Sequence, residues 1–364
     1  MRFSMQREVL LRPLQQVIGV VERRQTLPVL ANVLVQLADG RLSLTTSDLE
    51  VELSGSAEVE MAEAGEVTIP ARKLFDIVKA LPDGAKVEVG LSGERVLVKA
   101  GRSRYTLAAL PATEFPQSEI GEVVERVRVP QADLKVLIER TGFAMAVQDV
   151  RFYLNGLLLE RRGQGLRAVA TDGHRLALAD WNAEGEPGRQ VIVPRKGVLE
   201  LQRLLGSADG EVELAFSRNH VQVFLGDGQL VSKLIDGRFP DYEAVIPAVA
   251  DVPVVVDREE LRAALLRAAI LSNEKYRGIR VELADQLLRI SAHNPEQEEA
   301  VEEVPAECEA CSWAIGFNVN YVLDALSAIN TESVVLRLRD GNSSMLLEAP
   351  ESRSVRHVVM PLRL

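Results

Sequence analysis

The sequence predicts an α+β protein built from three tandem copies of one domain, each with two helices packed on two antiparallel sheets. Three observations support this fold class. A pattern of roughly 124 residues occurs three times, each occurrence opens with a short strand that runs into a helix, and the segments between helices alternate apolar and polar residues. Repeats of about 20–50 residues are typical of solenoids, whereas a period this long indicates duplicated domains.

The strand and helix that open each repeat are the first anchor of the pattern. They read RFSMQREVLLRPLQQVIGVVE at the N-terminus, RVRVPQADLKVLIERTGFAMA from residue 126 and PVVVDREELRAALLRAAILSNE from residue 253. Leu10 and Leu134 lie 124 residues apart, and Leu134 and Leu261 lie 127 apart. A second strand and helix follow in each repeat, with equivalent apolar residues 124 positions apart at Leu74, Val198 and Val322.

These anchors divide the chain into three predicted domains, residues 1–118, 119–249 and 250–364. The segments 111–122 and 242–253 contain proline and have no strong periodicity, so we expect them to be linkers.

The first half of the first repeat shows the expected order of elements. Strand RFSMQ precedes a helix from about Arg7 to Val21, and strands NVLVQL, RLSLTT and LEVELSG follow. Asp39-Gly40 separates the first two of these strands and predicts a two-residue hairpin turn.

The second half of the repeat has the same plan. Strand EVTIP precedes a helix from Arg72 to Leu81, and strands KVEVGL, RVLVKA and RYTLAAL follow. We expect Asp83-Gly84 to end the helix and Ser92-Gly93 to turn the hairpin. Period-two alternation in these strands indicates sheets with one buried and one solvated face.

The composition excludes several classes of protein. Apolar residues make up 47% of the chain, yet no apolar run approaches the ~20 residues that a membrane span needs. The N-terminus lacks the apolar core of a signal peptide. Two cysteines indicate no disulfide framework and suit a reducing compartment, so we expect a cytoplasmic protein.

The charge is negative overall but unevenly distributed. A net charge of −11 argues against a general nucleic-acid binder. Acidic residues gather in the segment 295–309, whereas cations recur on equivalent helices, except that the second helix of the third repeat (318–329) has none. The recurring cations are Arg7, Arg12, Arg23, Arg24, Arg72, Lys73, Lys79, Lys135, Arg140, Arg195, Lys196, Arg203, Arg258, Arg262 and Arg267. Two interpretations remain open, ordinary solvated helix faces or one shared basic surface.

No catalytic or metal site follows from the motifs. Cys308 and Cys311 form a lone C-x-x-C without partners at zinc-finger spacing, and we interpret it as chance placement in a loop. Asp172 and His174 invite an acid–base interpretation, but Asp-Gly between two strand-like runs is more simply a turn. Phosphate-binding, dinucleotide-binding, hydrolase and zinc-protease motifs are absent from the sequence, so we expect neither catalysis nor a cofactor.

Several longer segments resemble the bacterial β sliding clamps, the processivity subunits of the replicative DNA polymerase III. The similar segments are TLPVLANVL, TSDLEVEL, RFYLNG, ATDGHRLA, IVPRKGV, DGRFPDYEAV, ILSNEKYRGIR, NPEQEEA, GFNVNYVLDAL and the terminal VVMPLRL. The resemblance covers essentially the whole chain. It implies a head-to-tail homodimer whose six domains close a ring, with helices around double-stranded DNA and sheets outside.

The resemblance also implies a function without chemistry of its own. The ring would slide on DNA of any sequence and tether the replicative polymerase, the clamp loader and repair proteins through a short linear motif. Two rival functions remain. A nuclease would need clustered acidic metal ligands, and a cytoplasmic scaffold would bind proteins but not DNA.

Site residues follow from the resemblance position by position. Contact with DNA is implied for Arg24, Gln148, Phe152, Tyr153 and Lys196. Phe152 stands where the family has a tyrosine. The implied partner-peptide pocket comprises Arg151, Leu154, Thr171, Gly173, His174, Arg175, Leu176, Pro240, Val245, Asn318, Tyr321, Ser344, Val358, Met360, Pro361, Leu362 and Arg363.

Within this pocket, Asn342 stands where an apolar residue is expected, and we expect Arg151 and Arg175 to hold a carboxylate or carbonyls of the peptide. The alternative is that most of these residues belong to the core or to turns. The implied dimer contact joins Lys73, Arg102, Arg104, Tyr105 and Leu107 to Ile270, Leu271, Glu296, Glu298, Glu299 and Glu302.

Overall fold

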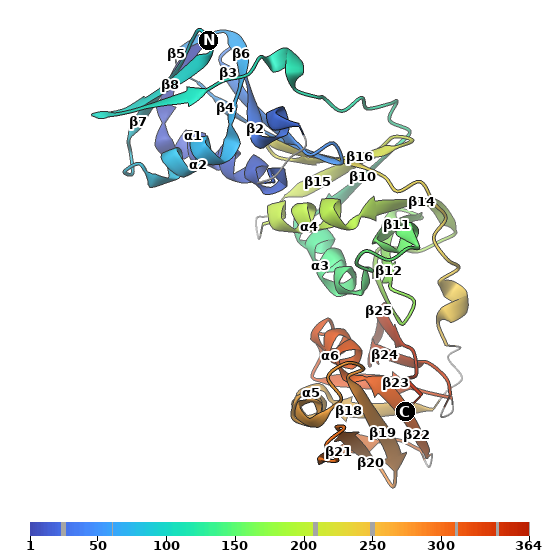
Figure 1. The fold of residues 1–364 in the computed structure, drawn as a ribbon. Helices are drawn as coiled ribbons and strands as arrows, with labels where there is room; N and C mark the ends of the chain where they lie inside the picture. The colour runs from blue at the N-terminus through green and yellow to red at the C-terminus, as the bar shows by residue number, and fades with distance from the viewer. Residues whose placement is uncertain are drawn as a thin grey trace. The chain divides into compact units, whose positions relative to one another are not determined.

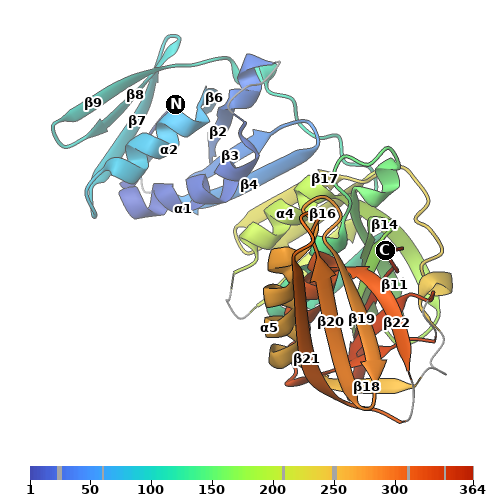
Figure 2. The same cartoon turned by 60° about the horizontal axis from the view of Figure 1, so that its bottom comes forward.

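The computed structural model describes residues 1–22, 27–59, 61–206, 210–247, 252–309, 312–339 and 342–363. These residues form two compact units (Figures 1 and 2). Unit 1 comprises residues 1–134 and 196–234, and unit 2 comprises residues 135–195 and 235–364.

The first repeat follows the predicted order of elements. Its elements are β1 (Arg2–Gln6), α1 (Arg7–Val17), β2 (Asn32–Ala38), β3 (Arg41–Ser47), β4 (Val51–Glu58), β5 (Met61–Glu63), β6 (Gly65–Pro70), α2 (Ala71–Ala80), β7 (Lys86–Ser92), β8 (Arg95–Ala100) and β9 (Ser103–Ala108). Short 3-10 turns cover Ile18–Val20, Pro28–Ala31 and Ala112–Glu114.

The second repeat has the same order. Its elements are β10 (Glu125–Pro130), α3 (Gln131–Thr141), β11 (Gly156–Arg162), β12 (Gly165–Thr171), β13 (Arg175–Trp181), β14 (Pro187–Pro194), α4 (Arg195–Leu204), β15 (Glu211–Phe216), β16 (His220–Leu225) and β17 (Gly228–Lys233). Its 3-10 turns cover Gly142–Ala144, Phe152–Leu154 and Glu243–Val245.

The third repeat completes the series. Its elements are β18 (Pro253–Asp257), α5 (Arg258–Ala268), β19 (Gly278–Ala284), β20 (Leu287–His293), β21 (Glu299–Glu307), β22 (Trp313–Asn318), α6 (Val319–Ser327), β23 (Ser333–Arg337), β24 (Met345–Ala349) and β25 (Ser352–Val359). One 3-10 turn covers Ala269–Leu271.

Local sequence explains most element boundaries. Asp39 and Gly40 both adopt positive φ, at 51° and 72°, as the predicted two-residue turn requires. The first helix is shorter than predicted, because the chain tightens into the 3-10 turn Ile18–Val20. The second predicted hairpin turn is wrong by one residue, since Ser92 pairs with Arg95 and the turn is Gly93-Glu94.

Sheets continue from one repeat into the next, which the period-two pattern alone does not reveal. In unit 1, β17 pairs with β4, so strands run in the order β10-β15-β16-β17-β4-β3-β2-β6. In unit 2, β13 pairs with β25, and the order is β14-β11-β12-β13-β25-β24-β23-β18-β21-β20-β19-β22. Both junctions are antiparallel and satisfy backbone groups that would otherwise form open edges.

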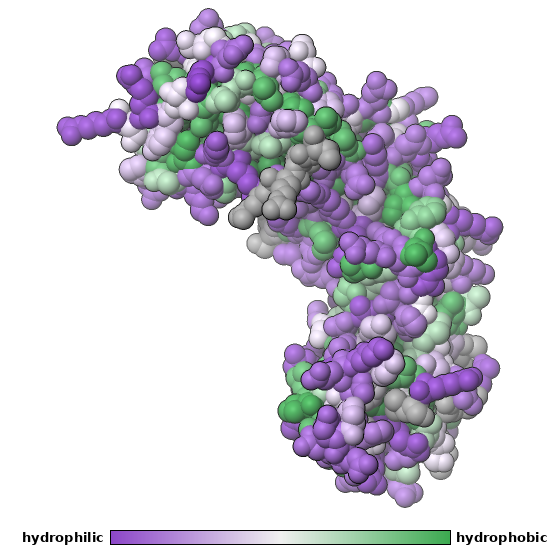
Figure 3. Space-filling view, viewed as in Figure 1, coloured by the Kyte–Doolittle hydropathy of each residue, from purple (hydrophilic) through white to green (hydrophobic). Residues whose placement is uncertain are grey.

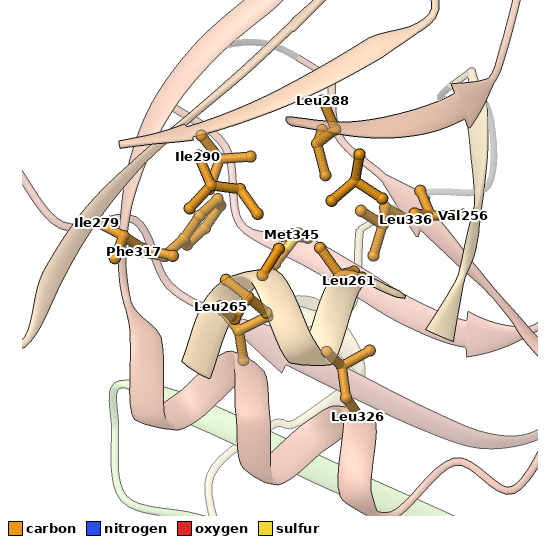
Figure 4. Close-up of a cluster of buried hydrophobic side chains, with 14 of the residues drawn as sticks. Val256, Leu261, Leu265, Ile279, Leu288, Ile290, Phe317, Leu326, Leu336 and Met345 are labelled. Carbon is orange, nitrogen blue, oxygen red and sulfur yellow. The ribbon is translucent and has the colours of Figure 1, made fainter. Parts of the chain in front are cut away.

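The core of the third repeat shows how each domain closes. Leu261 and Leu265 of α5, Leu326 of α6 and Phe317 of β22 belong to one buried apolar cluster (Figure 4). All four side chains are at most 2% exposed. Burial of each contributes about 1.5–3 kcal/mol relative to exposure, so the helix pair is the main apolar support of the sheets.

Candidate functional site

The turn between β12 and β13 carries four residues of the predicted peptide pocket, Thr171, Gly173, His174 and Arg175. Asp172 Oδ1 accepts hydrogen bonds from the backbone N–H groups of His174 (2.9 Å) and Arg175 (3.0 Å). Thr171 Oγ1 accepts one from Gly173 N–H (3.1 Å), and Gly173 adopts a φ of 89°. The interpretation of Asp172-Gly173 as a turn is therefore confirmed, and the Asp172 carboxylate is engaged in it.

Arg151 ties a neighbouring loop to this turn. Its guanidinium forms a two-pronged pair with Asp149 (2.9 and 2.8 Å) and donates to the carbonyl of Asp172 (3.1 Å). The hydrogen bonds from Arg151 lower the pKa of Asp149 to about 2. A Cβ on Gly173 would lie 2.8 Å from Arg151 Nη1 and would displace that guanidinium, while the φ of 89° is what favours glycine here.

Arg175 connects the second repeat to the third. It donates to Asp172 Oδ2 (3.0 Å) and to the carbonyl of Phe143 (2.7 Å), and it forms an ion pair with Asp324 of α6. Its guanidinium carbon lies 4.6 Å from the ring centroid of Tyr321. Arg151 and Arg175 thus both have partners within the chain, which fixes the positions of their guanidinium groups.

The C-terminal segment lies beside this turn, and backbone hydrogen bonds from its own N–H groups hold it in place. Met360 N–H donates to the carbonyl of His174 (2.9 Å), and Leu362 N–H donates to the carbonyl of Gly316 (2.7 Å). Met360, Pro361 and Leu362 are half-buried, so each retains surface for a partner. Arg363 is exposed, and Leu364 lies outside the described residues.

A buried apolar cluster underlies the predicted peptide pocket, which is called the groove below. Leu176 and Val358 are at most 3% exposed and belong to one cluster with Phe239 and Tyr242, against which Val245 packs. The core interpretation therefore applies to Leu176, Val358 and the buried Leu154. The remaining predicted residues lie in unit 2 as well: Asn318 caps α6, Tyr321 and Ser344 are half-buried, Pro240 and Asn342 are exposed.

Three of the residues predicted to contact DNA share one loop, which is also in unit 2. Gln148 is exposed with a φ of 54°, and Phe152 is 54% exposed with its ring edge-on to Tyr153. Two apolar neighbours in this loop that the sequence analysis did not single out are also on the surface: Val147 is 67% exposed and Val150 is 96% exposed. No periodicity marks a loop, so their exposure had no sequence signal.

The other two predicted DNA contacts differ from this group. Arg24 lies outside the described residues. Lys196 forms ion pairs with Glu22 and with Asp48, whose side chain is 5% exposed. Two carboxylates therefore lie against the Lys196 ammonium group and offset its charge.

Several of the recurring cations also have structural tasks. Their guanidinium groups donate to carbonyls at helix ends and turns: Arg7 to Val78 and Lys79, Arg72 to Val21, Arg203 to Gln15 and Gln16, and Arg258 to Ile329. A helix C-terminus carries unsatisfied carbonyls and favours positive charge. Recurrence on equivalent helices thus reflects shared capping as well as any shared basic surface.

The residues predicted for the dimer contact lie on two strands and their surroundings. β9 is the last strand of its sheet in the described part of the chain, and residues 299–305 of β21 pair with β20 on one side. Ile270 is 77% exposed and Leu271 half-buried, whereas Leu107 is already 8% exposed within the protomer. The Glu302 carboxylate accepts two hydrogen bonds from Arg267 of the same chain (3.0 and 2.6 Å).

The charged residues of that contact are on the surface. Lys73, Arg102, Arg104, Glu296, Glu298 and Glu299 are exposed, and Tyr105 is half-buried. Figure 3 shows a largely hydrophilic face with small apolar patches.

Cys308 is a half-buried free thiol, and its predicted neighbour Cys311 lies outside the described residues. No described helix is long and apolar enough to cross a membrane.

Three family models match the chain in order. They are the N-terminal, central and C-terminal domains of the DNA polymerase III beta subunit, over residues 1–119, 128–241 and 243–363. The beta sliding clamp of Pseudomonas aeruginosa is 54% identical over 367 residues, and that of Escherichia coli K12 is 49% identical over 366, each over 100% of both chains.

Solved structures agree with these matches. A crystal structure of the DNA polymerase sliding clamp from Pseudomonas aeruginosa with ligand has a TM-score of 0.97 and 53% identity over 100% of both chains. A sliding clamp from the same organism bound to griselimycin has a TM-score of 0.96 and 54% identity over 100% of both chains.

Three tandem α+β domains with antiparallel sheets define a DNA clamp, and the predicted fold class is confirmed. The chain belongs to the DNA polymerase III beta subunit family, the bacterial sliding clamps. It is a processivity subunit and not itself a catalytic enzyme, as the sequence predicted. The rival interpretations as a nuclease or as a scaffold that ignores DNA are not favoured.

Proposed function

We propose that two copies of this chain close head to tail into a ring around duplex DNA in the cytoplasm, with domains at 1–118, 119–249 and 250–364. The groove in unit 2 then tethers the replicative polymerase, the clamp loader and repair proteins. The observation that supports ring closure is the strand pairing at the two junctions inside the chain, which share one register.

The shared register follows from equivalent residues. At one junction Leu53 pairs with Leu230, and at the other Ala177 pairs with His357. Ala177 lies 124 residues after Leu53, which is the spacing of the first two repeats. Leu230 and His357 are equivalent by pairing: Leu214, the fourth residue of β15, faces Val223, which faces Leu230, and Leu336, the fourth residue of β23, faces Leu347, which faces His357. Both junctions therefore join the same two strands of the domain in the same alignment.

The open strands β9 and β21 are the third pair of this kind. Tyr105 is the third residue of β9, as Leu230 is of β17. Ala300 faces the sixth residue of β20, as Leu53 and Ala177 face the sixth residues of β3 and β12. Equal register places Tyr105 of one protomer opposite Ala300 of the other, in a heterologous contact that closes after two subunits.

Side chains around these strands suit that contact. Exposed Ile270 and half-buried Leu271 lie beside Tyr105 as its apolar centre, and Lys73, Arg102 and Arg104 face Glu296, Glu298 and Glu299. Glu302 contributes less, because Arg267 already holds its carboxylate.

A ring reconciles the negative net charge with DNA binding. Retention is topological, so contacts with phosphates can be weak and independent of sequence, as sliding requires. Loop residues Gln148, Phe152 and Tyr153 together with Arg24 would supply these contacts. The outer surface can then repel bulk DNA through the charge of −11.

The test of this function combines closure with topology. A Tyr105→Cys, Ala300→Cys variant is loaded on nicked circular DNA by the clamp loader and then oxidised. Cross-strand partners have Cβ atoms close enough for a disulfide, so we expect a closed ring that stays on the circle in denaturant. Cutting the DNA should release it. Equal retention on linear DNA would exclude encirclement, and a lack of cross-linking would exclude the register.

Direct DNA contact should appear in the salt dependence of affinity. We expect Arg24→Ala to weaken duplex binding equally for all sequences and to flatten the salt slope by about one unit. Lys196→Ala is the matched comparison, and it should change the slope less because Glu22 and Asp48 balance its charge. An unaltered slope for Arg24→Ala places that residue outside the DNA path, and a full unit for Lys196→Ala contradicts its internal pairing.

A further inference from the structure

We propose that Tyr242 is a positioning residue of the peptide groove: its hydroxyl, anchored in a buried charge cluster, fixes the segment 239–246 that carries Pro240 and Val245. The inference rests on the proposed tethering function of the groove. It concerns a residue beneath the groove rather than one that a peptide would touch.

The Tyr242 hydroxyl has three partners. It donates to Glu160 Oε2 (2.8 Å) and accepts from Arg162 Nη2 (3.2 Å) and Arg167 Nη1 (3.3 Å). Tyr242 is 3% exposed, Glu160 0% and Arg167 6%. Burial raises the pKa of Tyr242, so the phenol keeps the proton that it donates.

The surrounding charges form a compensated cluster on strands β11 to β14. Arg167 holds Asp180 with two hydrogen bonds (2.6 and 2.9 Å), and Gln190 donates to Glu160 (2.6 Å). Arg162 pairs with Glu160, and Glu243 pairs with both Arg162 and Arg167. Buried charges are tolerated only when they are paired and hydrogen-bonded, so this cluster is a rigid base for whatever it holds.

The segment 239–246 has some side chains buried in the core and others at the surface of the proposed groove. Phe239 and Tyr242 point down into the apolar cluster, with ring centroids 6.5 Å apart. Pro240 is exposed and Val245 half-buried above them. Val245 N–H donates to the carbonyl of Tyr242 (3.2 Å), so the position of Val245 depends directly on that of Tyr242.

The equivalent place in the first repeat has a simpler anchor, because Ser118 N–H donates to Glu52 Oε2 of β4 (3.1 Å). Phe115, Pro116 and Ser118 lie 124 residues before Phe239, Pro240 and Tyr242. Glu160 and Arg167 face each other across β11 and β12, whereas their equivalents across β2 and β3 are Gln36 and Ser43. The cluster of several charges therefore accompanies the junction that carries the proposed groove, whereas at the other junction of described strands a single carboxylate, Glu52, holds the equivalent segment.

The same sheet offers a matched control. Glu348 of β24 is 3% exposed and pairs with Arg337 (2.6 Å). It is a buried carboxylate in an ion pair like Glu160. It faces Arg356, which lies 3.8 Å from Asp180 at the rim of the charge cluster, but no described hydrogen bond or ion pair joins it to Tyr242 or to the rest of the segment 239–246. Glu348→Gln should lower the melting temperature without changing the groove.

The test measures binding of a labelled short peptide to the full-length chain. The peptide has the Gln near its start and the Leu and Phe at its end that the resemblance to sliding clamps implies. We expect Tyr242→Phe to weaken binding about tenfold, because three buried polar groups lose a partner and the segment loosens. In a Val245→Ala background the same substitution should have less than about a twofold effect, because its influence passes through Val245. In a Met360→Ala background it should keep its full effect.

Hydrogen exchange provides a second measurement, because it reports local opening of the segment separately from global unfolding. Backbone amides of residues 242–246 should exchange faster in Tyr242→Phe and unchanged in Glu348→Gln. Wild-type affinity in Tyr242→Phe overturns the inference, and so does an affinity loss in Glu348→Gln that matches its loss of stability. If the unsubstituted chain fails to bind the peptide, the tethering role of the groove falls together with the inference.

Discussion

Deleting Met360 to Leu364 should abolish peptide binding while the dimer and its retention on DNA persist. The segment supplies two half-buried apolar side chains, Met360 and Leu362, at the edge of an otherwise pre-formed floor. A short peptide buries little area and binds in the micromolar range, so the loss of two anchors removes most of its affinity. Fluorescence anisotropy with a labelled peptide measures the effect.

A gentler variant separates side chains from backbone in this prediction. Met360→Ala with Leu362→Ala keeps the hydrogen bonds to the carbonyls of His174 and Gly316. It should lose nearly as much affinity as the deletion, since Met and Leu provide the apolar contact. Peptide binding by the truncated chain at its original affinity contradicts the placement of the groove.

Replacing Ile270 and Leu271 together by alanine should convert the dimer to folded monomers at micromolar concentration. Ile270 is 77% exposed in the protomer, so its apolar surface is available for the partner. Each truncation costs about 2–5 kcal/mol if the side chain is fully buried, and a ring has two such contacts. Sedimentation velocity measures the oligomeric state, and circular dichroism verifies folding.

Leu266 provides the control for that variant. It lies on α5 of the same repeat and is 45% exposed, but it is not among the predicted contacts. Leu266→Ala should remain a dimer. Dimers of the Ile270, Leu271 double variant at micromolar concentration are incompatible with the proposed contact.

Periodicity predicts elements better than it predicts their partners. The repeat, together with the helical and strand periodicities, predicts the positions of β1 and α1 to within a few residues. This works because burial of one face of a helix or strand imposes a regular pattern of apolar residues on the sequence. The end of α1 was wrong because Ile18–Val20 remain apolar and partly buried in a tighter 3-10 turn. Pairing of β4 with β17 leaves no comparable signal, since a strand buries the same residues whichever neighbour it has.

The site shows the same division between local and distant determinants. Asp172-Gly173 is recognisable as a turn because its chemistry is local. The pair between Arg175 and Asp324 joins residues 149 positions apart, and no pattern in the chain announces it. The resemblance selected Lys196 as a DNA contact, yet only the fold brings Glu22 and Asp48 to its ammonium group.

The continuous sheets make the three repeats distinct in ancestry but dependent in folding. A fragment cut at the predicted linkers, residues 119–249, would retain a complete set of helices and strands. It would also expose the backbone edges of β13 and β17, which β25 and β4 cover in the whole chain. Unpaired edges recruit other strands, so such a fragment should associate with itself. The repeat is therefore the segment that was duplicated, but a single repeat should not fold stably without the strands of its neighbours.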